Sequence, residues 1–218
     1  MSYHFDGKVC LITGAASGIG RATAQKMASL GARLSLSYIN FHGLAETDRL
    51  CGGNHMAEVF DVASAASCEA FLIATISTLG RLDFVFNCAG VNPTAYALTD
   101  TSDEYWDKLV NTNLRGTYNI TRAAIPRLGP GSAIVNVTMA MELGPAQIRV
   151  NAVAPGYIAT PSNAGMVAGP AVVAEQEKGI AIGRFGTAGE VADVVAFLFS
   201  DESRYMSGSI VEVSGGRT

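Results

Sequence analysis

The segment with the clearest chemical meaning is a glycine-rich string near the N-terminus, Thr13-Gly14-Ala15-Ala16-Ser17-Gly18-Ile19-Gly20. Glycine lacks a Cβ, so its backbone can approach a polar ligand closely. A helix that begins directly after such a turn directs unpaired N–H groups at an anion, and a pyrophosphate suits this arrangement. The string therefore predicts a dinucleotide-phosphate loop, provided that a strand precedes it and a helix follows it.

The surrounding pattern meets this condition. Residues 8–13 form an apolar run typical of a buried strand, and apolar residues recur at helical spacing over 19–30. Further strands are predicted over 33–37, 56–60, 82–86, 133–138, 148–153 and 210–213, and further helices over 44–50, 65–79, 102–125 and 188–200. This alternation predicts one α/β domain over 1–218, with a Rossmann-type doubly wound parallel sheet and helices on both of its faces.

Composition narrows the classes of partner. The chain has 218 residues, of which 49% are hydrophobic, and a formal net charge of -4. A chain of this length builds one large core, and no basic stripe for nucleic acid or cationic amphipathic segment for a membrane is present. Neither a signal-peptide pattern nor a bilayer-spanning run occurs. We expect a cytoplasmic protein that acts on a small molecule.

Some reactive residue types have simpler interpretations. The four cysteines have no C-x-x-C spacing and no nearby His, so we expect reduced thiols and no metal site. The three histidines are scattered and expected at the surface. Arg21, which follows the glycine string, is likewise expected to be a surface charge.

The spacing T-G-x-x-x-G-I-G resembles that of the classical short-chain dehydrogenase/reductase family, and further family motifs follow in order. These are Asp61-Val62 for the adenine pair, Asn87-Cys88-Ala89-Gly90 for N-N-A-G, Asn113-Leu114 for the structural and catalytic asparagine, Arg149-Val150-Asn151 for the sixth strand, and Pro155-Gly156 with Thr160 for the loop over the nicotinamide. The resemblance covers nearly the whole chain. It implies that a nicotinamide dinucleotide is bound by Gly14, Ser17, Gly18, Ile19, Gly20, Tyr38, Asp61, Val62, Asn87, Ala89, Gly90, Pro155, Gly156 and Thr160.

Asn113 also stands out from its position in the predicted helix. Helical spacing places it on the same face as Trp106, Leu109 and Ile120, which we expect to pack against the sheet. A buried amide must find hydrogen-bond partners. Asn113 is therefore predicted to be a buried amide that either serves catalysis or only satisfies loop carbonyls; in the family both roles coincide.

The end of the second strand bears on the choice between NAD and NADP. Proteins of this architecture that prefer NAD usually carry an acid there, which binds the ribose hydroxyls and repels a 2′-phosphate. Here Tyr38 occupies that position, so the repulsion is absent. Ser17, where members of the family that favour NADP often have Arg or Lys, adds no positive charge. The cofactor is NADP or NAD, and the missing acid favours NADP.

The resemblance implies a catalytic tyrosine, a lysine four residues after it and a serine, all following the fifth strand. No tyrosine in the chain has a lysine four positions later. Tyr118 and Arg122 have the spacing but belong to another helix, and arginine does not share protons near neutrality. At the position of the serine, Thr138 keeps a hydroxyl and is the candidate that remains, together with Asn113.

The connection between the fifth and sixth predicted strands is short. Residues 139–148 must make a parallel crossover that usually needs a dozen residues or more, including a helix. Ten extended residues span roughly 33 Å, enough to return along a strand but too few to cover the sheet as a helix does. We therefore expect a shortened crossover and an apolar patch that is exposed or covered by a partner. The family commonly assembles through this helix, so homo-oligomerisation is expected but its usual interface is altered.

Three functions are compatible with the sequence. One is an oxidoreductase that interconverts a secondary alcohol and a ketone, with a flexible lid over 162–182. Another is a nucleotide-binding relative that has lost its acid/base and is inactive. The third is a shortened form of an active reductase, because the motifs on both sides of the short connection remain family-like.

Overall fold

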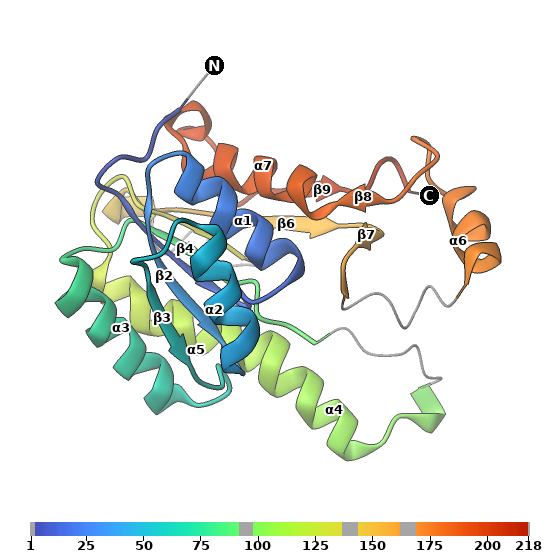
Figure 1. The fold of residues 1–218 in the computed structure, drawn as a ribbon, viewed down its shortest axis with the longest axis horizontal. Coiled ribbons are helices and arrows are strands. Elements are labelled where there is room, and N and C mark those ends of the chain that lie inside the picture. Colours follow the sequence, from blue (N-terminus) through green and yellow to red (C-terminus); the bar gives the residue numbers. More distant parts are fainter. Residues whose placement is uncertain (1–2, 92–97, 137–143, 162–168, 218) are drawn as a thin grey trace.

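The computed structural model describes residues 3–91, 98–136, 144–161 and 169–217. Its centre is a seven-stranded sheet of order β3-β2-β1-β4-β5-β6-β9, in which each neighbouring pair is parallel. The strands are β1 (Val9–Thr13), β2 (Arg33–Tyr38), β3 (Met56–Val59), β4 (Phe84–Phe86), β5 (Ala133–Val135), β6 (Arg149–Pro155) and β9 (Ile210–Val213). The predicted Rossmann-type parallel sheet is confirmed (Figure 1).

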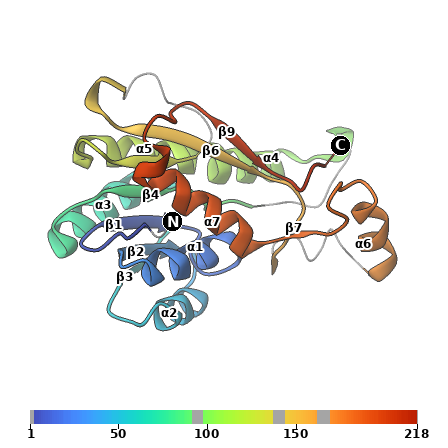
Figure 2. The same ribbon diagram turned by 90° about the horizontal axis from the view of Figure 1, so that it is seen from above.

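Helices cover both faces of the sheet (Figure 2). One layer contains α1 (Gly18–Ser29), α2 (Phe41–Leu50) and α7 (Ala188–Phe199), and the other contains α3 (Ala65–Leu79) and α5 (Gly116–Ala124). Successive side chains of a strand point to opposite faces. In β1, Cys10 and Ile12 therefore join the core on the α1 and α7 side, whereas Val9 and Leu11 join the core on the α3 and α5 side.

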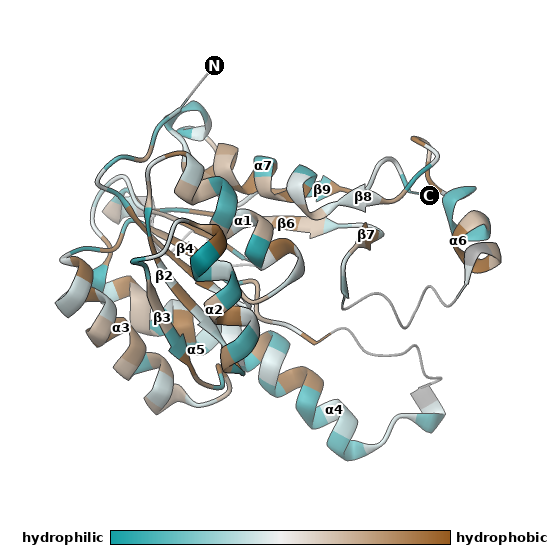
Figure 3. Cartoon of the chain, in the orientation of Figure 1, coloured by the Kyte–Doolittle hydropathy of each residue, from teal (hydrophilic) through white to brown (hydrophobic). Residues whose placement is uncertain are grey.

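The long helix predicted over 102–125 is divided into three parts. The hydroxyl of Ser102 caps α4 (Asp103–Leu109) by accepting a hydrogen bond from Tyr105 N–H at 3.3 Å, and the π-helical segment η2 (Val110–Arg115) leads into α5. No residue of α4 is buried, and this largely hydrophilic helix extends beyond the sheet (Figures 1 and 3). The prediction that Trp106 packs against the sheet is wrong, since it is 55% exposed. The extra residue in a π turn shifts the face that meets the core, which begins only in α5.

The region predicted as a flexible lid over 162–182 contains more structure than expected. Residues 162–168 lie outside the described part, but α6 (Pro170–Glu177) is a helix, with its proline at the favourable first position. Two short strands near this region, β7 (Ile158–Ala159) and β8 (Gly186–Thr187), pair with each other. None of the described helices combines the length and the apolar character that a bilayer crossing requires.

The two strands joined by the short crossover are neighbours in the sheet. β5 pairs directly with β6, and Ala133 lies opposite Arg149. Between them the structure describes Asn136 and residues 144–148, including the 3₁₀ turn η4 (Gly144–Ala146). The expected exposed apolar patch is absent at the described centre of this part of the sheet, because Ile134 and Val150 are at most 1% exposed. Ile125 and Leu128, after α5, pack against the same core cluster. Ile210 in β9 is 62% exposed, and whether a partner covers it stays a prediction.

A buried carboxylate ties the amino ends of two strands together. Asp83 accepts hydrogen bonds from Lys8 Nζ at 3.1 Å, Arg81 Nη2 at 2.6 Å and the N–H of Val9 at 3.0 Å. Burial alone raises the pKa of Asp83, but the bonds from Arg81, Val9 and Lys8 outweigh burial and lower the pKa below its usual value. This carboxylate therefore stabilises the fold above the pKa of an unfolded Asp, and the stabilisation is lost as the pH falls through the folded-state pKa.

We expect Asp83→Asn to lower the free energy of unfolding at pH 7 by about 1–3 kcal/mol, because a buried acceptor of charged donors is weakened. The difference from the unchanged protein should shrink between about pH 5 and pH 3, as the carboxylate of the latter becomes protonated. Urea unfolding of the variant and of the unchanged protein, at pH 7 and across the range from about pH 5 to pH 3, measures this difference. Asp193→Asn is the control, because Asp193 pairs with Lys26 at the surface and is 63% exposed. Equal effects of both changes at pH 7 would contradict the prediction.

Candidate dinucleotide site

The glycine string forms the turn between β1 and α1, and two of its glycines have backbone angles that favour glycine. The φ angles of Gly14 and Gly18 are +69° and +52°. A Cβ on Gly14 would lie 2.8 Å from the backbone N of Ala89, and a Cβ on Gly20 would lie 2.3 Å from the carbonyl oxygen of Gly14. The string is therefore a tightly packed turn that accepts no side chain at Gly14 or Gly20.

The turn leaves the start of α1 open to an anion. Ser17 is the N-cap, yet its side chain makes no capping hydrogen bond, and the first turn of α1 carries no acid. The leading N–H groups of a helix have no partner within the helix. These groups, together with the positive end of the helix dipole, fit a pyrophosphate.

The end of β4 is fixed against this turn by a buried threonine. Thr13 Oγ1 accepts hydrogen bonds from the N–H of Cys88 at 3.1 Å and of Ala89 at 3.0 Å, and Thr13 is 1% exposed. The carboxyl ends of β1 and β4 are adjacent in the sheet, where the strand order reverses. Ligands of open α/β sheets bind in the crevice at such a point.

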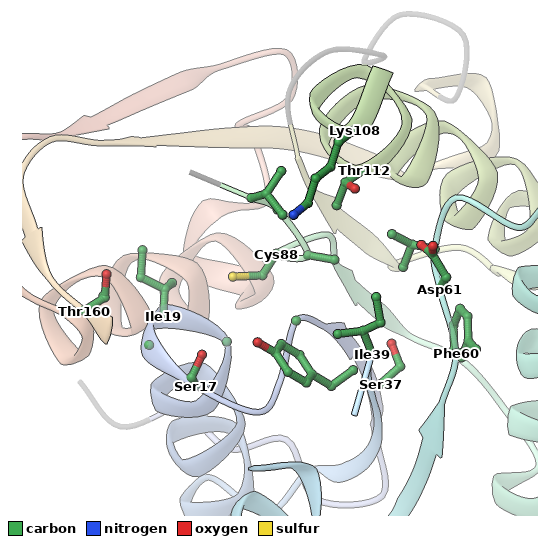
Figure 4. A pocket seen from close by; sticks show the side chains of 18 residues that line it. Ser17, Ile19, Ser37, Ile39, Phe60, Asp61, Cys88, Lys108, Thr112 and Thr160 are labelled. Carbon is green, nitrogen blue, oxygen red and sulfur yellow. The ribbon is translucent and has the colours of Figure 1, made fainter. Parts of the chain in front are cut away.

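A cavity of about 320 Å³ lies there (Figure 4). Ser17, Ile19 and Thr160 lie at one end and Phe60 with Asp61 at the other (Figure 4). The residues that line it are Gly14, Ser17, Gly18, Ile19, Gly20, Ser37, Tyr38, Ile39, Phe60, Asp61, Val62, Cys88, Ala89, Gly90, Val91, Lys108, Thr112 and Thr160. An elongated ligand can thus place phosphates at the glycine turn and a flat, apolar group between the ends of β2 and β3.

The structure brings together all the predicted cofactor residues except Asn87, Pro155 and Gly156. The Nδ2 of Asn87 donates a hydrogen bond to Thr121 Oγ1 at 3.0 Å, so this side chain links β4 to α5. Pro155 and Gly156 line a separate hollow beside β9. Whether these three residues contact a ligand stays a prediction.

Sequence reasoning missed several lining residues. Lys108 and Thr112 are four positions apart on the helix that precedes Asn113, so helical spacing could have identified them. Ile39 follows β2 and Phe60 follows β3, and each lies next to a predicted residue. Cys88 was expected only as a small apolar residue, and burial raises the pKa of its thiol to about 12. Cys88 therefore contributes a neutral thiol to the wall of the cavity.

Asn113 is placed differently from its prediction. Its side chain is exposed, where a buried amide was expected. Asn113 Oδ1 accepts a hydrogen bond from Val91 N–H at 2.8 Å, and its Nδ2 donates to the Val91 carbonyl at 3.0 Å. The amide thus holds the chain that follows β4, beside the cavity, from the π-helical segment η2. Thr138, the other catalytic candidate, lies outside the described residues.

Comparisons with known proteins agree with this geometry. The profile of a family described as enoyl-(acyl carrier protein) reductase matches residues 14–140 and 138–218. The 3-oxoacyl-(acyl-carrier-protein) reductase FabG of Thermotoga maritima is 34% identical over 243 residues, covering 97% of this chain and 98% of that protein. The human (3R)-3-hydroxyacyl-CoA dehydrogenase is 34% identical over 249 residues, covering 95% of this chain and 94% of that protein.

Solved structures are similar over nearly their full lengths. A short-chain dehydrogenase/reductase of Brucella melitensis superposes with a TM-score of 0.93 at 27% identity, covering 99% of this chain and 98% of that one. A short-chain dehydrogenase of Burkholderia cenocepacia, in complex with NADP, has a TM-score of 0.87 at 28% identity, with 98% of each chain covered. The parallel sheet, the glycine turn with its cavity and these similarities together establish that the chain belongs to the short-chain dehydrogenase/reductase family of oxidoreductases.

Proposed function

We propose that this chain binds NADP(H) in the cavity at the carboxyl ends of β1, β2 and β4. The observation that supports this most is the tight turn at Gly14 and Gly20, which opens α1 toward a cavity of suitable size. The NADP bound by the Burkholderia relative adds support. A bound nicotinamide would donate or accept a hydride, and the reaction we propose for this lineage is the interconversion of a secondary alcohol and a ketone.

Preference for NADP(H) over NAD(H) rests on the charges around the ribose. Tyr38 ends β2 where an acid would repel a 2′-phosphate, and Ser37 beside it is also uncharged. Among the described lining residues, Lys108 is the one cation and Asp61 the one acid. Asp61 Oδ1 accepts a hydrogen bond from Ala63 N–H at 2.9 Å, at the adenine end that the resemblance assigns to it.

The variant Tyr38→Asp tests this preference. We expect it to weaken NADPH binding by about tenfold or more, because a carboxylate next to a phosphate costs roughly 1.4 kcal/mol or more at a partly exposed site. NADH binding should be unchanged or stronger. Titrations of each nucleotide, followed by the fluorescence of Trp106 and of the nicotinamide, give both affinities. A Tyr38→Phe control separates the charge from the loss of the hydroxyl; equal weakening by both variants would contradict the proposed cause.

Hydride transfer also needs a proton donor near the carbonyl oxygen. Tyr118 with Arg122 has the spacing of the family motif, but its ring lies on α5, is 47% exposed and does not line the cavity. Cys88 is a neutral thiol because of its raised pKa. We propose that Asn113 and Thr138 are the residues of the family's catalytic set that this chain retains, and that it turns substrate over at well below about 1 per second.

A second candidate function is that of a shortened form of an active reductase. The alignment to the Thermotoga relative has 243 positions, more than the 218 residues of this chain, so the alignment contains positions without a counterpart here. The two profile matches meet at residues 138–140, where the catalytic helix of the family is expected. We propose that an internal segment with the tyrosine and lysine is missing at this point.

We also propose the cytoplasmic location and the homo-oligomeric state that are expected of the family.

Two measurements on the purified chain test the proposed cofactor and the proposed loss of turnover. Saturable NADPH binding supports the dinucleotide site, and its absence contradicts the proposal. Turnover of a panel of ketones and 3-oxoacyl thioesters, followed by NADPH absorbance, then tests the chemistry. A rate of about 1 per second or faster would contradict the proposed loss of the acid/base.

A further inference from the structure

The side chain of Arg21 lies beneath the phosphate loop and is not the surface charge expected from sequence. Its Nη2 donates hydrogen bonds to the carbonyl oxygens of Ala16 at 2.5 Å and of Gly43 at 3.1 Å, and its Nε donates to Thr47 Oγ1 at 2.9 Å. One guanidinium therefore joins the loop before α1 to helix α2. The five donors of arginine and its planar fork suit such a three-way contact.

Thr47 holds the neighbouring peptide of the same loop. Its side chain is fully buried, and its Oγ1 lies 2.9 Å from the carbonyl oxygen of Ala15 and 3.0 Å from that of Gly43. The backbones are close here, since a Cβ on Gly43 would lie 2.9 Å from the Cβ of Ala16. Helix α2 is thus packed directly on the part of the loop that faces away from the cavity.

These contacts fix the direction of two peptide planes. A trans peptide is planar, and its N–H points opposite to its C=O. Holding the carbonyl of Ala15 fixes the N–H of Ala16, and holding the carbonyl of Ala16 fixes the N–H of Ser17, which lines the cavity. Amides that are oriented before the ligand arrives bind it without the entropic cost of ordering them.

We propose that Arg21 and Thr47 are positioning residues for phosphate recognition, which they serve through the carbonyls of Ala16 and Ala15. Neither side chain lines the cavity, so neither touches the nucleotide. The inference rests on the proposed binding of NADP(H). It adds that helix α2 is part of the recognition site, and that the change of a residue behind the loop selectively weakens the hold on the 5′-phosphates.

The test uses two probes with the full chain. NADPH contains the pyrophosphate, whereas adenosine 2′-monophosphate has the adenosine and the 2′-phosphate without the 5′-phosphates. For Thr47→Val and Arg21→Met we expect the Kd for NADPH to rise about tenfold, since each change leaves a loop carbonyl without a donor. The Kd for adenosine 2′-monophosphate should change less than twofold. Thr47→Ser, which keeps the hydroxyl, should bind NADPH almost as the unchanged chain does.

Arg49→Met is the matched control. Arg49 is on the same helix, and it pairs with Glu46 at the surface without a contact to the loop. We expect its affinities for both probes to be unchanged. Equal weakening of both probes by Thr47→Val, or a lower melting temperature with unchanged NADPH affinity, would overturn the inference and leave a purely structural role. Failure of the unchanged chain to bind NADPH would instead contradict the proposed function itself.

Discussion

Gly14→Ala is expected to abolish detectable NADPH binding and to lower the free energy of unfolding by about 2–4 kcal/mol. The new Cβ would lie 2.8 Å from backbone atoms of Cys88 and Ala89, and the residue would have to keep a φ of +69°. The loop can avoid this overlap only by moving away from β4. That movement would break the hydrogen bonds that Thr13 makes to the N–H groups of Cys88 and Ala89.

The chain offers a matched control for this change. Gly53 has a φ of +73°, and a Cβ placed there would meet no atom within 4 Å. Gly53→Ala therefore carries the same backbone strain without the overlap, and should cost about 1 kcal/mol while leaving NADPH binding intact. Calorimetry and nucleotide titration of both variants measure the two effects. Similar NADPH affinities of the two variants would contradict the prediction that close packing at Gly14 is needed for binding.

Insertion of a family-type helix with Tyr-x-x-x-Lys at residues 138–140 should raise turnover by roughly a hundredfold to ten-thousandfold. The tyrosine would supply the proton that hydride transfer to a ketone requires, and the lysine would lower the tyrosine pKa. The matching segment of the Thermotoga maritima reductase is a suitable insert, because that protein aligns on both sides of the join. Reduction rates with NADPH and a 3-oxoacyl thioester measure the gain.

The control for the insertion is the same chimera with its tyrosine changed to phenylalanine. It should fold and bind NADPH as the active chimera does, but stay near the rate of the unchanged chain. If the tyrosine-containing chimera binds NADPH and is no faster, the missing segment is not what limits this protein. The inactive nucleotide-binding relative would then be the better description.

The strands and the phosphate loop could be predicted from sequence because their signals are local. The run that contains β1 and the glycines after it specify a buried strand and a tight turn without reference to the rest of the chain. Lys108 and Thr112 have a weaker local signal. They are four positions apart, but Thr112 lies in the π-helical segment η2, where regular helical spacing does not hold. Trp106 is exposed because α4 extends beyond the sheet, and Asn113 is exposed in the π-helical segment η2, although simple helical spacing predicted that both pack inward.

The role of Arg21 was hidden for a different reason. Its partners are the carbonyls of Ala16 and Gly43 and the hydroxyl of Thr47, and carbonyl contacts leave no pattern of residue types in a sequence. The short crossover could be predicted by counting residues, but the burial of the sheet residues beside it could not. Ile125 and Leu128 pack against the core cluster that contains Ile134 and Val150, and their positions depend on how the chain leaves α5.

The pairing of β5 with β6 also bears on the order in which the sheet forms. Ala133 lies opposite Arg149, whereas β1 pairs with β4 through Cys10 and Phe84, and β6 pairs with β9 through Ala152 and Ile210. Closing a loop costs more entropy as the loop lengthens, and non-local pairing slows folding. The short connection therefore makes β5–β6 the least costly pair of the sheet to close, and we expect it to form early. The edge strand β9 comes last of the seven strands in the sequence, so its pairing with β6 completes the sheet only after the other six strands have been synthesised.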